Sequence, residues 1–167
     1  GNPWKAMPAM VVSATVSTSP TMIYFGQEVG EPGAEDAGFG DPSRTSIFDY
    51  IGVPQHQKWM NGGKFDGGQL SENEKALRNY YSEVLNFTRN SSALMGEYME
   101  LHSFNRKQNP TYTDKAFAFA RWDENQKLIV VTNFDEFQSV KTMLKLSPEL
   151  LKEWNLEPGE REIKEVM

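Results

Sequence analysis

The sequence predicts an α+β protein with helices in its first half and antiparallel strands in its second half. Ser71-Glu72-Asn73-Glu74 matches a capping box, and the apolar residues that follow recur at helical spacing to about residue 89. Residues 116–122 alternate small and aromatic side chains, which is the period of a half-buried strand. Residues 127–133 provide an apolar return strand after a polar turn, so the pair predicts a β-hairpin.

The first half is expected to hold two further elements and one long loop. Residues 3–17 favour a helix that is apolar on most of its surface, with Pro3 in the first turn. Residues 21–25, Thr-Met-Ile-Tyr-Phe, are β-branched, aromatic or apolar without interruption, and they predict a buried strand. Residues 26–70 are irregular and rich in Gly, Asp and Pro, and loops of this length are commonly functional or disordered. The aromatic residues in this stretch favour an ordered loop.

The second half is expected to begin near residue 97, so that residues 1–96 and 97–167 form separate regions. Two more strands are predicted there, at Val140–Leu146 and Tyr98–Phe104. Ser147 and Pro148 then indicate the start of a short helical turn that runs through Trp154.

Composition excludes several classes of function. The chain has 167 residues and a formal net charge of −6, which argues against nucleic-acid binding because phosphate contacts need clustered Lys and Arg. No apolar run approaches the ~20 residues of a membrane span, and no signal peptide is visible. With no cysteine there is no disulfide and no thiolate site, so composition leaves the cellular compartment open.

One segment resembles a known family. Residues 19–28, Ser-Pro-Thr-Met-Ile-Tyr-Phe-Gly-Gln-Glu, are similar to the eighth-strand segment of the α-amylase family of glycoside hydrolases. Thr18 stands where that family often has Gly. Downstream, Arg44-Thr45-Ser46-Ile47 is similar to the family's Arg-Thr-Pro-Met, with Ser46 in place of Pro.

The resemblance implies that the chain is a C-terminal fragment of a (β/α)8 TIM barrel followed by an antiparallel β-sandwich, domain C. Residues 1–96 would be the end of the catalytic barrel, and residues 97–167 would be domain C, possibly truncated. The other barrel strands would lie upstream. The strand at 21–25 would then lack both neighbours, and we expect the exposed barrel surfaces to cause self-association.

The resemblance also implies a retaining mechanism, but it places no catalytic residue in this chain. Retaining glycosidases use two carboxyl groups about 5–5.5 Å apart. The family has a third Asp after an Asn-His pair, whereas neither His56 nor His102 is followed by Asp. We therefore expect the fragment alone to be inactive on starch and maltooligosaccharides.

Four residues are candidates for contact with an α-glucan substrate: Glu28, Arg44, Tyr50 and Trp59. Each has a structural alternative. Glu28 could accept hydrogen bonds from loop amides, Arg44 could pair with a loop carboxylate, and the aromatic rings could pack the loop. The spacing of the acidic residues Glu31, Glu35, Asp36 and Asp41 matches no EF-hand pattern, and acidic loop residues are usually solvated, so neither a metal nor another cofactor is expected.

Two functions remain open from the sequence. The first is a non-catalytic piece of an α-amylase-like hydrolase. The sequence leaves the location of the parent enzyme open, and a periplasmic or secreted parent is compatible with it. The second is a free-standing carbohydrate-binding module that uses Tyr50, Trp59 and the β half without hydrolysis.

Overall fold

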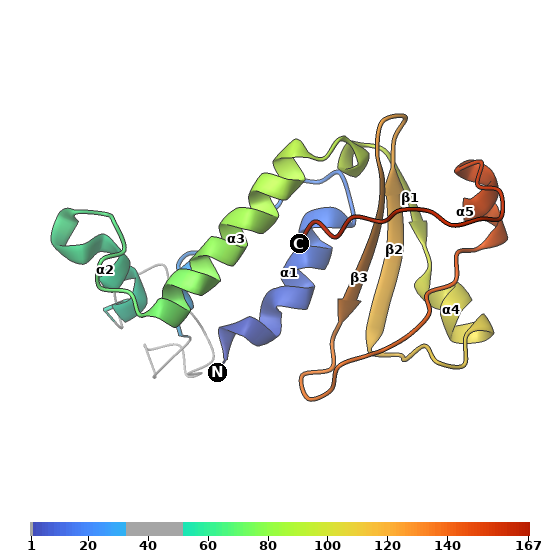
Figure 1. Cartoon of the computed structure of the whole chain (residues 1–167). Coiled ribbons are helices and arrows are strands. Elements are labelled where there is room, and N and C mark those ends of the chain that lie inside the picture. The colour runs from blue at the N-terminus through green and yellow to red at the C-terminus, as the bar shows by residue number, and fades with distance from the viewer. Residues whose placement is uncertain (1, 33–51) are drawn as a thin grey trace. The chain divides into compact units, whose positions relative to one another are not determined.

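The computed structural model describes residues 2–32 and 52–167 (Figure 1). The helices and strands, in chain order, are η1 (Pro3–Ala6), α1 (Met7–Thr15), η2 (Gln27–Val29), α2 (Pro54–Met60), η3 (Asn61–Gly63), α3 (Glu72–Asn90), η4 (Ser92–Met95), β1 (Glu97–Glu100), α4 (His102–Gln108), β2 (Ala116–Trp122), β3 (Lys127–Asn133) and α5 (Pro148–Glu153), where η denotes a 3-10 helix. Within the described ranges, no helix is both long enough and apolar enough to cross a membrane.

The chain forms two compact units. Unit 1 comprises Gly1–Trp4 and Thr21–Leu85, and unit 2 comprises Lys5–Pro20 and Asn86–Met167. The division places α1 in the same unit as the sheet, although 80 residues or more of sequence separate them.

The sheet of unit 2 has three antiparallel strands in the order β1-β2-β3. The β2–β3 hairpin is confirmed over the residues that alternation predicts, with Ala116 opposite Asn133 and Trp122 opposite Lys127. Its turn is closed by Asp123, whose Oδ1 accepts hydrogen bonds from the backbone N–H groups of Asn125 and Gln126. This is the side-chain mimicry of a turn that Asp commonly provides.

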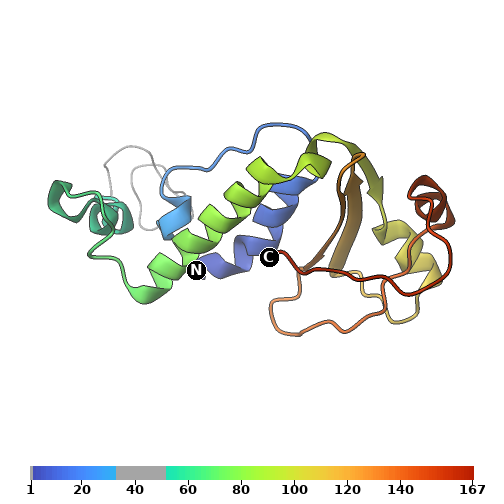
Figure 2. The ribbon, with the colours of Figure 1, turned by 45° about the horizontal axis from the view of Figure 1, so that its top comes forward.

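Helices cover both faces of this sheet (Figure 2). Ala118 and Ala120 face a core formed with Leu101, Leu150 and Trp154, and their small side chains let that layer lie close to the strands. On the opposite face, Phe119 is fully buried, and α1 lies against β3. The residues of α1 that are buried are Met7, Met10, Val11, Ala14 and Thr15. Because both faces are covered, β2 has almost no polar side chain.

The exception in β2 is Arg121, which is 1% exposed. Its guanidinium donates hydrogen bonds to the carbonyl oxygens of Thr15 and Val16, at 3.4 and 2.8 Å, and to those of Leu94 and Gly96. Burial lowers the pKa of Arg121, but a guanidinium remains charged at any ordinary pH. The positive charge is therefore balanced by carbonyl dipoles, two of which belong to the C-terminal end of α1.

The predicted strand at Val140–Leu146 is wrong, although the segment alternates exposed and part-buried residues. Its backbone bonds to asparagine side chains of unit 2 and not to a neighbouring strand. Asn105 donates from Nδ2 to the carbonyl of Lys145 and accepts at Oδ1 from the N–H of Lys145, both at 2.9 Å. Asn109 donates to the carbonyl of Met143. The alternation reflects an extended chain without a strand partner.

The prediction for residues 98–104 is correct only in its first part. A strand is present at Glu97–Glu100, but α4 begins at His102. Glu100 accepts a hydrogen bond from the N–H of Ser103 in the first turn of α4. The helical turn after Ser147 is confirmed as α5, and the side chain of Ser147 accepts from the N–H of Leu150.

The predicted strand at residues 21–25 is also wrong. Met22 is 87% exposed, and no strand ladder includes these residues in the part of the chain that the structure describes. A short β-prone run forms a strand only beside a partner, and the described residues provide none here. The α+β class is confirmed. The described residues form a small three-stranded antiparallel sheet, and among them there are neither the parallel strands of a barrel nor the second sheet of a sandwich.

The two predicted helices of the first half are confirmed with adjusted ends. Residues 3–6 are a 3-10 turn, and the α-helix proper begins at Met7, because Pro8 is tolerated only in a first turn. The second helix is α3, and it buries Leu77, Tyr81 and Val84. The predicted boundary near residue 97 stays a prediction.

Phe119→Ala should lower the free energy of unfolding by about 3–5 kcal/mol, because it leaves a cavity in the core of unit 2. Phe137→Ala is the matched control, since Phe137 is 81% exposed, and it should cost less than about 1 kcal/mol. Chemical denaturation followed by circular dichroism measures both. Equal losses for the two variants would mean that the strand faces are assigned wrongly.

Candidate functional site

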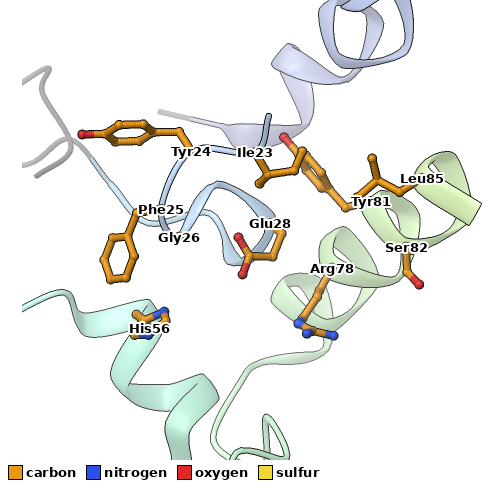
Figure 3. A pocket seen from close by; sticks show the side chains of 10 residues that line it. All are labelled: Ile23, Tyr24, Phe25, Gly26, Glu28, His56, Arg78, Tyr81, Ser82 and Leu85. Atoms are coloured by element: carbon orange, nitrogen blue, oxygen red, sulfur yellow. The ribbon is translucent and has the colours of Figure 1, made fainter. Parts of the chain in front are cut away.

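Unit 1 contains a cavity of about 440 Å³ at the end of the extended segment 21–25 (Figure 3). The residues that line it are Ile23, Tyr24, Phe25, Gly26, Glu28, His56, Arg78, Tyr81, Ser82 and Leu85. They come from three places in the chain: the segment that ends in η2, helix α2, and helix α3. In Figure 3 the side chain of Glu28 lies between the Phe25–Gly26 backbone and α3.

The turn at the base of the cavity depends on two glycines. Gly26 and Gly30 both have φ of 73°, a left-handed conformation that costs glycine little. A Cβ on Gly26 would also meet the side chain of Glu31, and one on Gly30 would press against Pro3 and Leu77. The chain can therefore fold tightly around η2 only with glycine at these positions.

Gln27 fixes this turn to α3. Its Oε1 accepts a hydrogen bond from the N–H of Tyr24 at 3.1 Å, and its Nε2 donates to the hydroxyl oxygen of Tyr81 at 2.9 Å. Burial raises the pKa of Tyr81, so its hydroxyl is neutral at ordinary pH. One side chain thus sets the distance between two walls of the cavity.

Glu31 connects the same turn to α2. Its Oε2 accepts a hydrogen bond from the N–H of His56 at 2.9 Å, so the carboxylate caps the first turn of α2 from outside the helix. Burial raises the pKa of Glu31, and the amide of His56 only partly offsets this effect. Because its pKa is raised, ionised Glu31 costs stability at neutral pH, and that cost falls as the pH is lowered.

A row of rings extends from the cavity along α2. The ring of His56 lies 4.5 Å from that of Phe25 and 5.6 Å from that of Trp59, between ring centroids. Trp59 in turn contacts Phe65 edge-on, at 5.8 Å. The guanidinium carbon of Arg78 lies 5.4 Å from the centroid of Trp59, which is a cation–π contact.

Helix α3 contributes a face that sequence analysis did not identify. Arg78, Ser82 and Leu85 follow one another at i, i+4 and i+7, so they lie on one side of the helix next to the buried stripe of Leu77 and Tyr81. The signal available in the sequence is a charged and a polar residue placed at helical spacing beside that stripe. The sequence signal alone does not place these residues at a cavity, because η2 and α3 come together from distant parts of the sequence.

The four residues predicted to contact substrate have different positions. Glu28 lines the cavity. Trp59 lies outside the lining but contacts His56 and Arg78, which belong to it. Arg44 and Tyr50 lie outside the described residues, as do Glu35, Asp36 and Asp41. Contact of Arg44 and Tyr50 with substrate therefore stays a prediction.

The chemistry of the lining is that of a polar recognition site. Glu28 supplies acceptors, Arg78 and Ser82 supply donors, and the rings of Tyr24 and Phe25 supply flat apolar surface. Glu28 is the one carboxylate in the lining, as far as the structure describes it. Within residues 2–32 and 52–167, no group of three or more His, Cys, Asp or Glu residues could hold a metal ion.

Comparisons of the chain with protein-family models, with curated proteins and with solved structures find no significant match.

The wall formed by α2 is tied to α3 through Glu74. The capping box is confirmed: Glu74 accepts from the N–H of Ser71 at 2.7 Å, and Ser71 Oγ accepts from the N–H of Glu74 at 3.3 Å. The other carboxylate oxygen of Glu74 accepts from Lys58 of α2 at 2.9 Å. Burial raises the pKa of Glu74, but the hydrogen bonds from Ser71 and Lys58 outweigh it and hold the pKa at about 2.

Ionised Glu74 should therefore stabilise the fold above the unfolded-state pKa of 4.5, and this contribution should be lost as the pH falls toward 2. We expect Glu74→Gln to cost about 1–2 kcal/mol at neutral pH and progressively less in acid. The control Glu72→Gln removes a more exposed partner of Lys75 and should cost less than about 0.5 kcal/mol. A cost for Glu74→Gln that stays constant from neutral pH to pH 3 would contradict the assignment.

Proposed function

We propose that the chain is the C-terminal part of an α-amylase-like retaining glycoside hydrolase acting on α-linked glucans such as starch and maltooligosaccharides. In this proposal it forms one wall of the substrate cleft and carries none of the catalytic carboxylates. Residues 1–96 are then the end of a (β/α)8 barrel, and residues 97–167 belong to the antiparallel domain C.

One observation carries the proposal. The segment that resembles the family, residues 19–28, supplies five of the ten cavity-lining residues: Ile23, Tyr24, Phe25, Gly26 and Glu28. The segment chosen by its similarity to a family that binds glucans is therefore also the segment that borders the cavity. A volume of about 440 Å³ lies within the range of small-molecule sites.

The chemistry of the lining supports a sugar as ligand. A glucose unit has hydroxyl groups around its rim and C–H groups on its two faces, so it needs hydrogen-bonding groups at its edge and a ring beneath it. Glu28 and Arg78 meet the first need, and the more exposed rings of Tyr24 and Phe25 meet the second. Glu28 is the one carboxylate among the described lining residues, and the retaining reaction needs two carboxyl groups, which is why the proposal assigns binding and not hydrolysis to this chain.

Titration of the 167-residue chain with maltotriose, followed by NMR or calorimetry, tests the proposal. We expect binding that Glu28→Gln and Arg78→Met each weaken about tenfold or more, the value of a hydrogen bond to a charged group. Glu83→Gln and Arg89→Met are matched controls on exposed positions of α3 outside the lining, and they should leave binding unchanged. Cellotriose, with β-linked units, should not bind.

Three results would contradict the proposal. The first is the absence of maltotriose binding, and the second is binding that survives both lining substitutions. The third is turnover in a reducing-sugar assay with the chain alone that disappears in Glu28→Gln, because Glu28 would then be catalytic.

A different pattern would favour the alternative function. Binding that is lost in Trp59→Ala but kept in Glu28→Gln would indicate a free-standing carbohydrate-binding module.

A further inference from the structure

Strand β3 forms one edge of the sheet in unit 2, and half of its backbone groups point away from β2. In an antiparallel pair, residues alternate between those that exchange hydrogen bonds and those that do not. Phe134 donates to the carbonyl of Lys115 and Asp123 donates to that of Gln126, which fixes this alternation. Leu128, Val130 and Thr132 therefore bond to β2.

The groups directed outward along β3 belong to Lys127, Ile129, Val131 and Asn133. Among the described residues, none forms a backbone hydrogen bond with these outward groups. Val131 is 51% exposed, and the stretch from Leu128 to Thr132 contains neither a charge nor a proline. A charged side chain or a proline is what usually protects an edge strand from pairing with another chain, and the middle of β3 has neither.

The other edge, β1, differs in this respect. It is four residues long and begins and ends with a glutamate, Glu97 and Glu100. Very short edge strands are one of the devices that limit pairing at the edge of a sheet. The sheet therefore has one short edge that carries two glutamates and one longer edge, β3, whose central residues carry no charge.

We propose that β3 pairs antiparallel with β3 of a second copy of this chain, with the two Val130 residues opposite each other on the two-fold axis. In this register Ile129 faces Val131 of the second copy. The backbone groups of both residues point outward from their own sheets, so they can exchange hydrogen bonds across the dimer axis. The result is an isologous dimer with a continuous six-stranded sheet.

The charges along β3 do not oppose its pairing with β3 of a second copy. Lys127 faces Asn133 of the second copy, so no like charges meet along the strand. The acidic residues that follow β3 are neutralised within their own chain, Asp135 by Lys115 at 3.1 Å and Glu136 by Lys5. Self-association was expected from the sequence through residues 21–25, but that segment forms no strand; the dimer uses β3.

Sedimentation velocity of the full chain over a concentration series tests the proposal. We expect a reversible monomer–dimer equilibrium that Val131→Lys abolishes, because the added charges lie beside the axis. Val166→Lys is the matched control, since Val166 is 50% exposed and lies outside the strands, and it should dimerise like the parent chain. Circular dichroism checks that both variants are folded. A monomer at every concentration, or a dimer that survives Val131→Lys, would overturn the proposal.

Cysteine cross-linking tests the register, because the chain has no cysteine of its own. Val130→Cys should form a disulfide-linked dimer under mild oxidation, since the two residues face each other across the axis. Thr132→Cys is the control: Thr132 is on the same face of β3 and equally buried, but it faces Leu128 of the second copy. Equal cross-linking of the two variants, or none at Val130→Cys, would overturn the register.

Discussion

Unit 2 depends on a buried positive charge whose partners are carbonyl oxygens. The guanidinium of Arg121 contacts the last carbonyls of α1 and those of Leu94 and Gly96, which precede β1. A helix end leaves its final carbonyls without intrahelical donors, and Arg121 supplies the donors that two of them lack. One side chain from β2 therefore joins the end of α1 to the connection between η4 and β1, which lies far from α1 in sequence. Gly96 has to be glycine here because a Cβ would meet the carbonyl of Trp122.

In unit 1 a neutral side chain, Gln27, joins two segments that are distant in sequence. Gln27 bonds to the backbone of Tyr24 and to the hydroxyl of Tyr81, and the left-handed glycines on either side of η2 bring the turn against α3. These contacts fix the position of the segment 23–28 relative to α3, and the cavity lies between them. If the chain belongs to an α-glucan hydrolase, as proposed, this turn shapes one wall of the cleft while the reacting carboxylates lie elsewhere.

Local patterns predicted much of the fold, and long-range contacts decided the rest. The hairpin and α3 followed from alternation and from the Ser71–Glu74 capping box, which are signals contained within a few residues. The extended segments at 21–25 and 140–146 have the same composition as strands, and nothing local reveals that neither belongs to a strand ladder in the part of the chain that the structure describes. In the second segment, Asn105 takes the partner's place. The site shows the same limit, since Glu28 was identified from its segment whereas Arg78 required the packing of α3 against η2.

The most direct test of this account is the stability of Arg121→Met, measured by chemical denaturation beside Arg106→Met. Arg106 is a half-exposed arginine that pairs with Asp114 in the same unit. We expect Arg121→Met to lose about 3 kcal/mol or more, because methionine leaves buried carbonyls without donors. Arg106→Met should lose less than about 1 kcal/mol. A loss for Arg121→Met no larger than that of Arg106→Met would contradict the central role of the buried guanidinium.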